Sequence, residues 1–74
     1  MVSVKINKPS FIVSDVILQQ KGDFTENDIL NQVKDRLIDQ FESLENLSNY
    51  VIFKLNDMCE YGLIGRTELY YFQV

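Results

Sequence analysis

The chain contains no histidine, no tryptophan and a single cysteine, Cys59. Without histidine, the usual zinc-site spacings and any pairing of a nucleophile with a histidine base are absent. One cysteine cannot form a disulfide within the chain. Apolar neighbours at helical spacing indicate a buried thiol, with a nucleophilic or redox thiol as the alternative. We therefore predict that the protein is not an enzyme and binds no cofactor and no metal.

Long apolar runs are also missing. The start of the chain lacks the apolar run of a signal peptide, and the longest apolar stretches are far shorter than a membrane span. Together with the unpaired cysteine, this predicts a cytoplasmic protein with no membrane partner. The 74 residues, 46% of them apolar and 24% charged, indicate one folded domain over residues 1–74 rather than a disordered chain.

Motifs that bind phosphates or calcium are absent as well. The chain has no glycine-rich phosphate-binding loop, and no spacing among its acids matches a calcium loop. The acids in the middle of the chain are expected to be solvated; they are Asp35, Asp39, Glu42 and Glu45. No small-molecule substrate is inferred.

The net charge of −4 is unevenly distributed. Residues 1–37 hold five basic and five acidic side chains, whereas residues 38–74 hold two basic and six acidic ones, so the whole excess lies in the second half. The two basic residues there are Lys54 and Arg66. Because DNA attracts basic surfaces and repels acidic ones, this distribution disfavours DNA as a partner.

The first part of the chain predicts a strand and then a helix. Alternating apolar residues indicate a strand over residues 2–6, which we expect to pair with a C-terminal hairpin. A helix is predicted from Pro9 or Ser10 to Lys21, although its β-branched content would also suit a strand. One face of this helix comprises Ile12, Val13, Val16, Ile17 and Gln20. Phe11 and Leu18 form a second apolar stripe, which predicts burial on two sides.

Two further helices follow. Thr25 and Asp28 match a capping box, so a helix is expected to begin with the residue after Thr25, Glu26. Its apolar side chains recur every three or four residues: Ile29, Leu30, Val33, Leu37 and Phe41. The third helix is predicted over residues 50–61.

The flanks of the third helix and the end of the chain complete the expected fold. Residues 42–48 are predicted as a polar linker in which Ser48 or Asn46 caps the helix, and Gly62 as its stop. Strand segments are expected at residues 63–64 and 69–74, separated by a polar break at residues 65–67. The expected fold class is therefore α+β: a three-helix domain with a small antiparallel sheet made of the N-terminal strand and the C-terminal hairpin.

This order resembles the winged helix-turn-helix family. The resemblance is carried by Asp23-Phe24-Thr25 with the helix that follows, and by residues 55–64 followed by Tyr70-Tyr71-Phe72. In that family the third helix is the recognition helix, a glycine-leucine-isoleucine step leads into the wing, and a tyrosine-rich strand returns. The resemblance implies a winged-helix-like domain with a role in transcription regulation. The break at residues 65–67 leaves only a stub of a wing, and the linker is longer than a tight turn.

A wheel of the third helix, at about 100° per residue, separates two arcs. The core arc comprises Val51, Ile52, Leu55, Met58 and Cys59, and the opposite arc comprises Tyr50, Phe53, Asn56, Asp57 and Glu60. Rings beside acids favour a protein partner or a homodimer, with Tyr50, Phe53, Asp57 and Glu60 as the contact residues. The other interpretation of Tyr50 and Phe53 is that another element, such as Phe11 or Leu44, covers them.

Direct binding of double-stranded DNA as a transcriptional regulator is the alternative function. The third helix would then enter the major groove, and the residues that would contact DNA are Ser48, Asn49, Lys54 and Asn56, with Arg66 in the stub of the wing.

Overall fold

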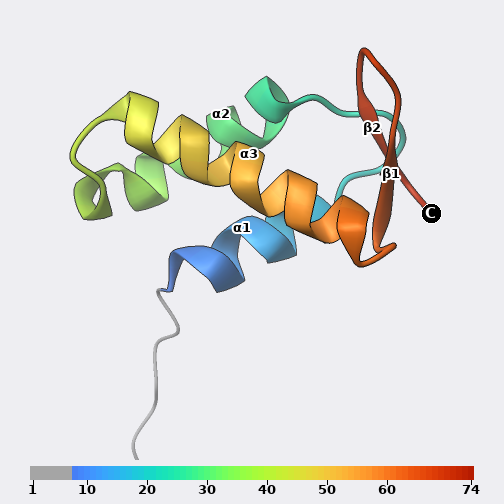
Figure 1. The fold of residues 1–74 in the computed structure, drawn as a ribbon. Helices are drawn as coiled ribbons and strands as arrows, with labels where there is room; N and C mark the ends of the chain where they lie inside the picture. Colours follow the sequence, from blue (N-terminus) through green and yellow to red (C-terminus); the bar gives the residue numbers. More distant parts are fainter. Residues whose placement is uncertain (1–7) are drawn as a thin grey trace, which may run out of the picture.

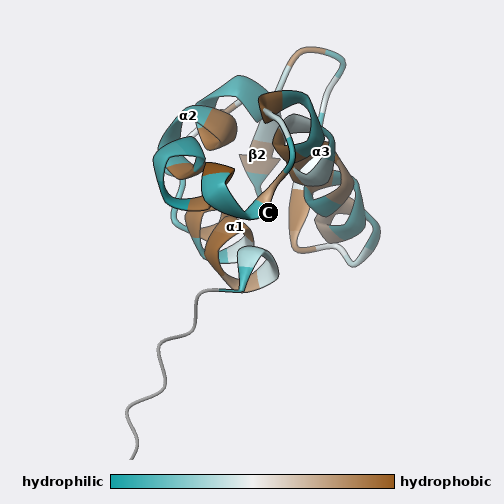
Figure 2. Ribbon diagram, turned by 90° about the vertical axis from the view of Figure 1, so that its left-hand side faces the viewer, coloured by the Kyte–Doolittle hydropathy of each residue, from teal (hydrophilic) through white to brown (hydrophobic). Residues whose placement is uncertain are grey.

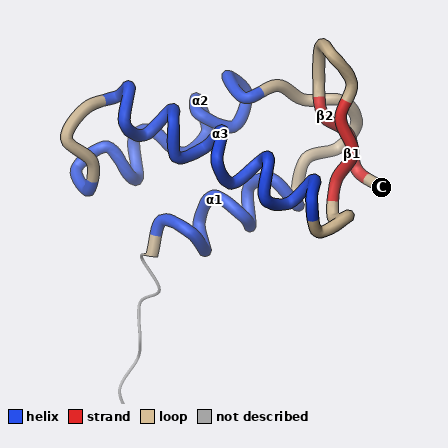
Figure 3. Tube along the Cα trace, viewed as in Figure 1, coloured by secondary structure: helices blue, strands red, loops and turns tan. Residues whose placement is uncertain are grey.

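The computed structural model describes residues 8–74, so the strand predicted over residues 2–6 lies outside the part described. Three helices lead into a hairpin (Figures 1 and 3). The elements are α1 (Pro9–Leu18), α2 (Glu26–Leu37), the short 3-10 helix η1 (Ile38–Gln40), α3 (Leu44–Glu60), β1 (Ile64–Arg66) and β2 (Tyr71–Gln73). The predicted α+β class is confirmed, with three helices and a small antiparallel sheet.

Helix α1 begins as predicted, with Pro9 in its first turn, and ends three residues earlier than predicted. The side-chain Nε2 of Gln20 donates a hydrogen bond to the carbonyl oxygen of Val16 at 2.9 Å. This is the carbonyl that the backbone N–H of Gln20 would reach in a continued helix, so the side chain replaces the next helical hydrogen bond. Gly22, with φ of 82°, then turns the chain.

Helix α2 starts as the capping box predicts. The Asp28 backbone N–H donates to Thr25 Oγ1 at 3.2 Å, and the Thr25 backbone N–H donates to Asp28 Oδ2 at 2.9 Å. The helix buries Ile29, Val33 and Leu37 on one face, as its spacing predicts.

Helix α3 corrects the sequence prediction at its start. It begins at Leu44, so the linker predicted over residues 42–48 is mostly helix, and neither Ser48 nor Asn46 is its cap. Ser43 is the cap, because its Oγ accepts a hydrogen bond from the Asn46 backbone N–H at 3.1 Å. The added turns bury Leu47 beside the core residues one and two turns further along, and that buried apolar area stabilises them.

The end of α3 lies one residue before the predicted end, and Gly62 stops the helix as predicted. The helix ends at Glu60, and Gly62 has φ of 77°, a conformation that side chains other than glycine rarely adopt. The Leu63 backbone N–H donates to the carbonyl of Met58 at 3.0 Å, so the last turn is closed by the chain that leaves it.

The hairpin corrects the predicted position of the break. Gly65 and Arg66 belong to β1, and Gly65 pairs with Phe72 in β2. A Cβ at Gly65 would overlap the Phe72 ring, which explains a glycine inside a strand. The turn lies one or two residues later, where the Thr67 hydroxyl accepts hydrogen bonds from the backbone N–H groups of Leu69 and Tyr70 at 3.2 and 3.1 Å.

A third segment joins the hairpin from the connection between α1 and α2. Phe24 forms an antiparallel bridge with Tyr71, with N–H to O=C distances of 2.9 and 2.7 Å in the two directions. The two rings stack with centroids 5.9 Å apart. Residues 24 and 71 are far apart in the sequence, so this bridge fixes the hairpin against the start of α2 (Figure 1).

The core is one cluster of apolar side chains drawn from all three helices, Phe24 and Ile64. Within residues 8–74, no polar or charged residue is buried. Helix α1 packs on α2 and α3 through Ile12, Val13 and Ile17, as predicted. Its second stripe is not buried: Phe11 is 60% and Leu18 50% exposed, because both packing partners lie on the other side of α1. The predicted burial of α1 on two sides is wrong for this chain.

Candidate interaction surface

The outward side of α3 is the part of the structure that the sequence singled out for function. The side that faces the core buries Leu47, Val51, Leu55 and Met58. The predicted core arc is therefore correct in its centre, while Ile52 and Cys59 are only half-buried at its edge. Asn49, Phe53, Asn56 and Glu60 are exposed on the opposite side.

Phe53 is exposed, and no element within residues 8–74 covers it. Its side chain is 60% exposed, while Phe11 and Leu44, the two residues that could have covered it, are themselves 60% and 51% exposed. The Phe53 ring lies 6.4 Å from the ring of Tyr50, and Tyr50 lies 5.4 Å from Phe41. We call Phe41, Tyr50 and Phe53 the aromatic row. It runs from the half-buried edge of the core out to the surface, so Phe53 is supported from one side and open on the other.

The predicted contact residues form one stripe along α3. Tyr50, Phe53, Asp57 and Glu60 are spaced by three, four and three residues, which keeps them on one side of a helix. Tyr50 and Asp57 are half-buried, and Phe53 and Glu60 are exposed. The structure therefore brings these four residues together, with the rings toward the start of the helix and the acids toward its end.

The residues of the DNA alternative are brought together only in part. Arg66 Nη1 donates to Asn56 Oδ1 at 2.8 Å, so β1 and α3 meet through this pair. Lys54 Nζ donates instead to Ser10 Oγ at 2.9 Å, across to the start of α1. Ser48 is half-buried in the second turn of α3 rather than at its cap, and Asn49 is exposed.

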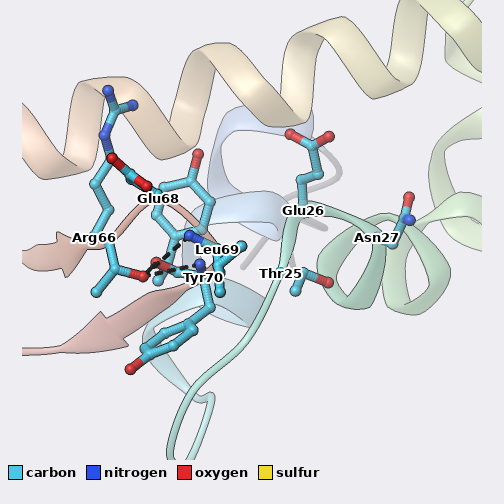
Figure 4. Close-up of a pocket in the computed structure, with 9 residues that line it drawn as sticks. Thr25, Glu26, Asn27, Arg66, Glu68, Leu69 and Tyr70 are labelled. Atoms are coloured by element: carbon cyan, nitrogen blue, oxygen red, sulfur yellow. Dashed lines mark hydrogen bonds between the residues drawn. The ribbon is translucent and has the colours of Figure 1, made fainter.

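An open groove of about 790 Å³ lies between the start of α2 and the tip of the hairpin (Figure 4). It is lined by Thr25, Glu26, Asn27, Arg66, Thr67, Glu68, Leu69, Tyr70 and Tyr71. Its walls carry two acids and one base. The sequence does not predict it, because the bridge between Phe24 and Tyr71 that brings the two walls together depends on tertiary contacts. The capping box pairs the backbone N–H groups of Thr25 and Asp28. The acidic side chains of Glu26 and Glu68 on the walls repel an anion, so the start of α2 does not make this groove an anion site.

Cys59 lies at the border of the core, where the sequence placed it inside. Burial raises the pKa of the thiol, and the positive charge of Arg66 opposes this rise. A thiol with a raised pKa is mostly protonated near neutral pH and is a weak nucleophile. The part of the chain that the structure covers holds no group of three or more side chains able to bind a metal.

Comparison of the chain with known protein families, with curated proteins and with solved structures finds no match. None of the helices in the described part of the chain is long and apolar enough to cross a bilayer.

Proposed function

We propose that the protein is a non-enzymatic, winged-helix-like domain that acts through contact with another protein, as an accessory or modulator in transcription. The contact residues are Tyr50, Phe53, Asp57 and Glu60. The observation that carries the proposal is Phe53, an aromatic side chain that is 60% exposed on the outer side of a regular helix. Aromatic residues are enriched at the centre of protein interfaces, where they supply much of the binding energy.

The order of elements supports the winged-helix part of the proposal. Three helices are followed by a hairpin, and the chain between α1 and α2 adds Phe24 to the edge of that hairpin. The winged-helix resemblance gives the third helix the role of recognition element, and here α3 carries the exposed ring. The role in transcription rests on the resemblance alone.

The charge of the same region favours protein over DNA. Across residues 44–74 there are four acidic and two basic side chains, and two of the acids, Asp57 and Glu60, belong to the proposed contact residues. DNA binding depends largely on basic groups that neutralise phosphates, so acids on the contact side repel it.

The test of the protein-contact proposal compares two exposed apolar residues. Phe53→Asp changes the proposed surface, whereas Leu69→Asp changes the hairpin tip, where Leu69 is 83% exposed. Both variants and the unchanged chain are used as baits for affinity capture followed by mass spectrometry. We expect partners that are lost with Phe53→Asp and retained with Leu69→Asp, at unchanged far-UV circular dichroism. Equal recovery with all three baits would refute the assignment of this surface.

A second candidate, direct binding of double-stranded DNA, is favoured by one observation. The hydrogen bond from Arg66 to Asn56 holds a guanidinium at the junction of hairpin and helix, and its remaining N–H groups could reach a phosphate. Fluorescence anisotropy with a labelled random duplex in about 50 mM salt tests it, because such binding weakens steeply as salt rises. Salt-dependent binding at micromolar protein that is lost in Arg66→Gln would support this candidate, and its absence would exclude it for the isolated chain.

A further inference from the structure

The exposed side of α1 carries a second apolar surface, separate from the one on α3. Much of the α1 ribbon has the colour of hydrophobic residues (Figure 2). Ile12, Val13 and Ile17 are buried in the core, whereas Phe11 and Leu18 are 60% and 50% exposed. A helix that is apolar all round is usually buried all round. Within residues 8–74, neighbouring elements pack against only one side of α1, and its other side is exposed.

The exposed side of α1 also contains a hollow. A hollow of about 350 Å³ is lined by Ser10, Phe11, Ser14, Asp15 and Leu18. Its lining combines the small side chains of Ser10 and Ser14 with the large apolar side chains of Phe11 and Leu18. A volume of this size is sufficient for an aromatic side chain. The same side of α1 thus presents both an exposed ring and a hollow beside it.

We infer that this surface pairs with the same surface of a second copy of the chain, α1 against α1 in antiparallel orientation. A two-fold axis that crosses the exposed side of α1, at the level of residues 12 and 13 along the helix, would place each Phe11 opposite the hollow at Ser14 of the other copy. The contact is then isologous, with one patch serving both copies, as in most homodimers.

The charges on α1 agree with this arrangement. Lys8 and Asp15 are both exposed and are seven residues apart, which places them on the same side of a helix about 10 Å apart along its axis. With the two-fold axis at the level of residues 12 and 13, each Lys8 would lie within about one helical turn of Asp15 in the other copy. Two pairs of Lys8 and Asp15 therefore flank the apolar contact. In a parallel pairing, Lys8 would instead lie beside Lys8 of the other copy, and Asp15 beside Asp15.

The size of the surface sets the expected strength. One side of a helix of 10 residues buries less than the standard interface of about 800 Å² per partner. We therefore expect a weak dimer whose dissociation constant is on the order of 100 µM. Contacts on α3 are not needed for it.

Analytical ultracentrifugation of the full chain tests the dimer. Between about 5 µM and 1 mM protein, the average mass is expected to rise from the monomer value of 8.7 kDa toward twice that value. Phe11→Asp should hold the mass at the monomer value at all concentrations, whereas Phe53→Asp should behave as the unchanged chain. A monomer over the whole range, or a dimer that Phe53→Asp and not Phe11→Asp dissociates, would overturn the inference.

Exchange of the charges at Lys8 and Asp15 tests the antiparallel orientation itself, because it leaves the apolar surface of α1 unchanged. Lys8→Asp alone and Asp15→Lys alone should each weaken the dimer about tenfold, because each replaces two attractive pairs by two repulsive ones. The double variant restores opposite charges and should recover the original dissociation constant. Both changes also suit the helix, since an acid is favoured at its start and a base near its end. A double variant as weak as the single ones would rule out the antiparallel arrangement.

Discussion

Substitutions at two positions of α3, Phe53 and Leu55, should affect stability to different extents, because the first side chain is exposed and the second is buried. Phe53 is 60% exposed, and Leu55, two residues later, is fully buried. Complete burial of a phenylalanine contributes about 1.5–3 kcal/mol, so the buried 40% of Phe53 contributes about 1 kcal/mol. Alanine is the better helix former by about 0.5 kcal/mol, which offsets part of this loss. Phe53→Ala should therefore lower the free energy of unfolding by less than about 1 kcal/mol.

Leu55→Ala is the matched control, because it removes a buried side chain from the same helix. A leucine-to-alanine change in a core costs about 2–5 kcal/mol, from lost burial and from the cavity that remains. For a domain of this size, 1 kcal/mol corresponds to a change in Tm of about 4–8 °C. Thermal unfolding followed by far-UV circular dichroism should therefore show a small shift for Phe53→Ala and a drop of at least about 8 °C for Leu55→Ala. Equal drops would mean that Phe53 stabilises the fold, and the proposed contact surface would lose its main support.

The remaining predictions concern the hairpin, a cap and the thiol. Gly65→Ala should destabilise the fold by about 1–3 kcal/mol in urea unfolding, because its new Cβ overlaps the Phe72 ring; an unchanged midpoint would contradict this. Thr25→Ala removes the capping hydrogen bond of α2 and should cost about 1 kcal/mol, whereas Thr25→Ser should restore most of it. Since burial raises the pKa of Cys59, iodoacetamide at pH 8 should label it more slowly than free cysteine, and Arg66→Gln should slow it further; a faster reaction would refute this.

Local chemistry was sufficient to predict several features of the fold. The capping box of Thr25 and Asp28 places the start of α2 correctly, because both hydrogen bonds form between residues three apart. Gly62 predicts the stop of α3 because the positive φ at this position is a local backbone requirement that glycine meets. The stripe of Tyr50, Phe53, Asp57 and Glu60 also follows from helical spacing alone.

Features that depend on long-range contacts were missed. Helix α3 starts earlier than its sequence predicts, because the polar composition of residues 42–48 is typical of a linker while the burial of Leu47 favours a helix. The local sequence at Gly65 predicts a turn, but the residue lies in a strand, because the ring that packs over it comes from Phe72. The exposure of Phe11 and Leu18 could not be read from a helix that is apolar all round, because the pattern does not state which sides find a neighbour.

The two bases of the acidic half of the chain are positioned by neutral partners. Lys54 donates a hydrogen bond to Ser10, which directs it toward α1. Arg66 donates to Asn56, which directs it toward the junction of α3 and the hairpin. Neither base belongs to the predicted contact residues, so the charge at the C-terminal end of this set comes from Asp57 and Glu60. A binding segment that complements this side of α3 needs an apolar group for the aromatic row and basic groups one to two turns further along. An acidic polymer such as DNA satisfies neither requirement.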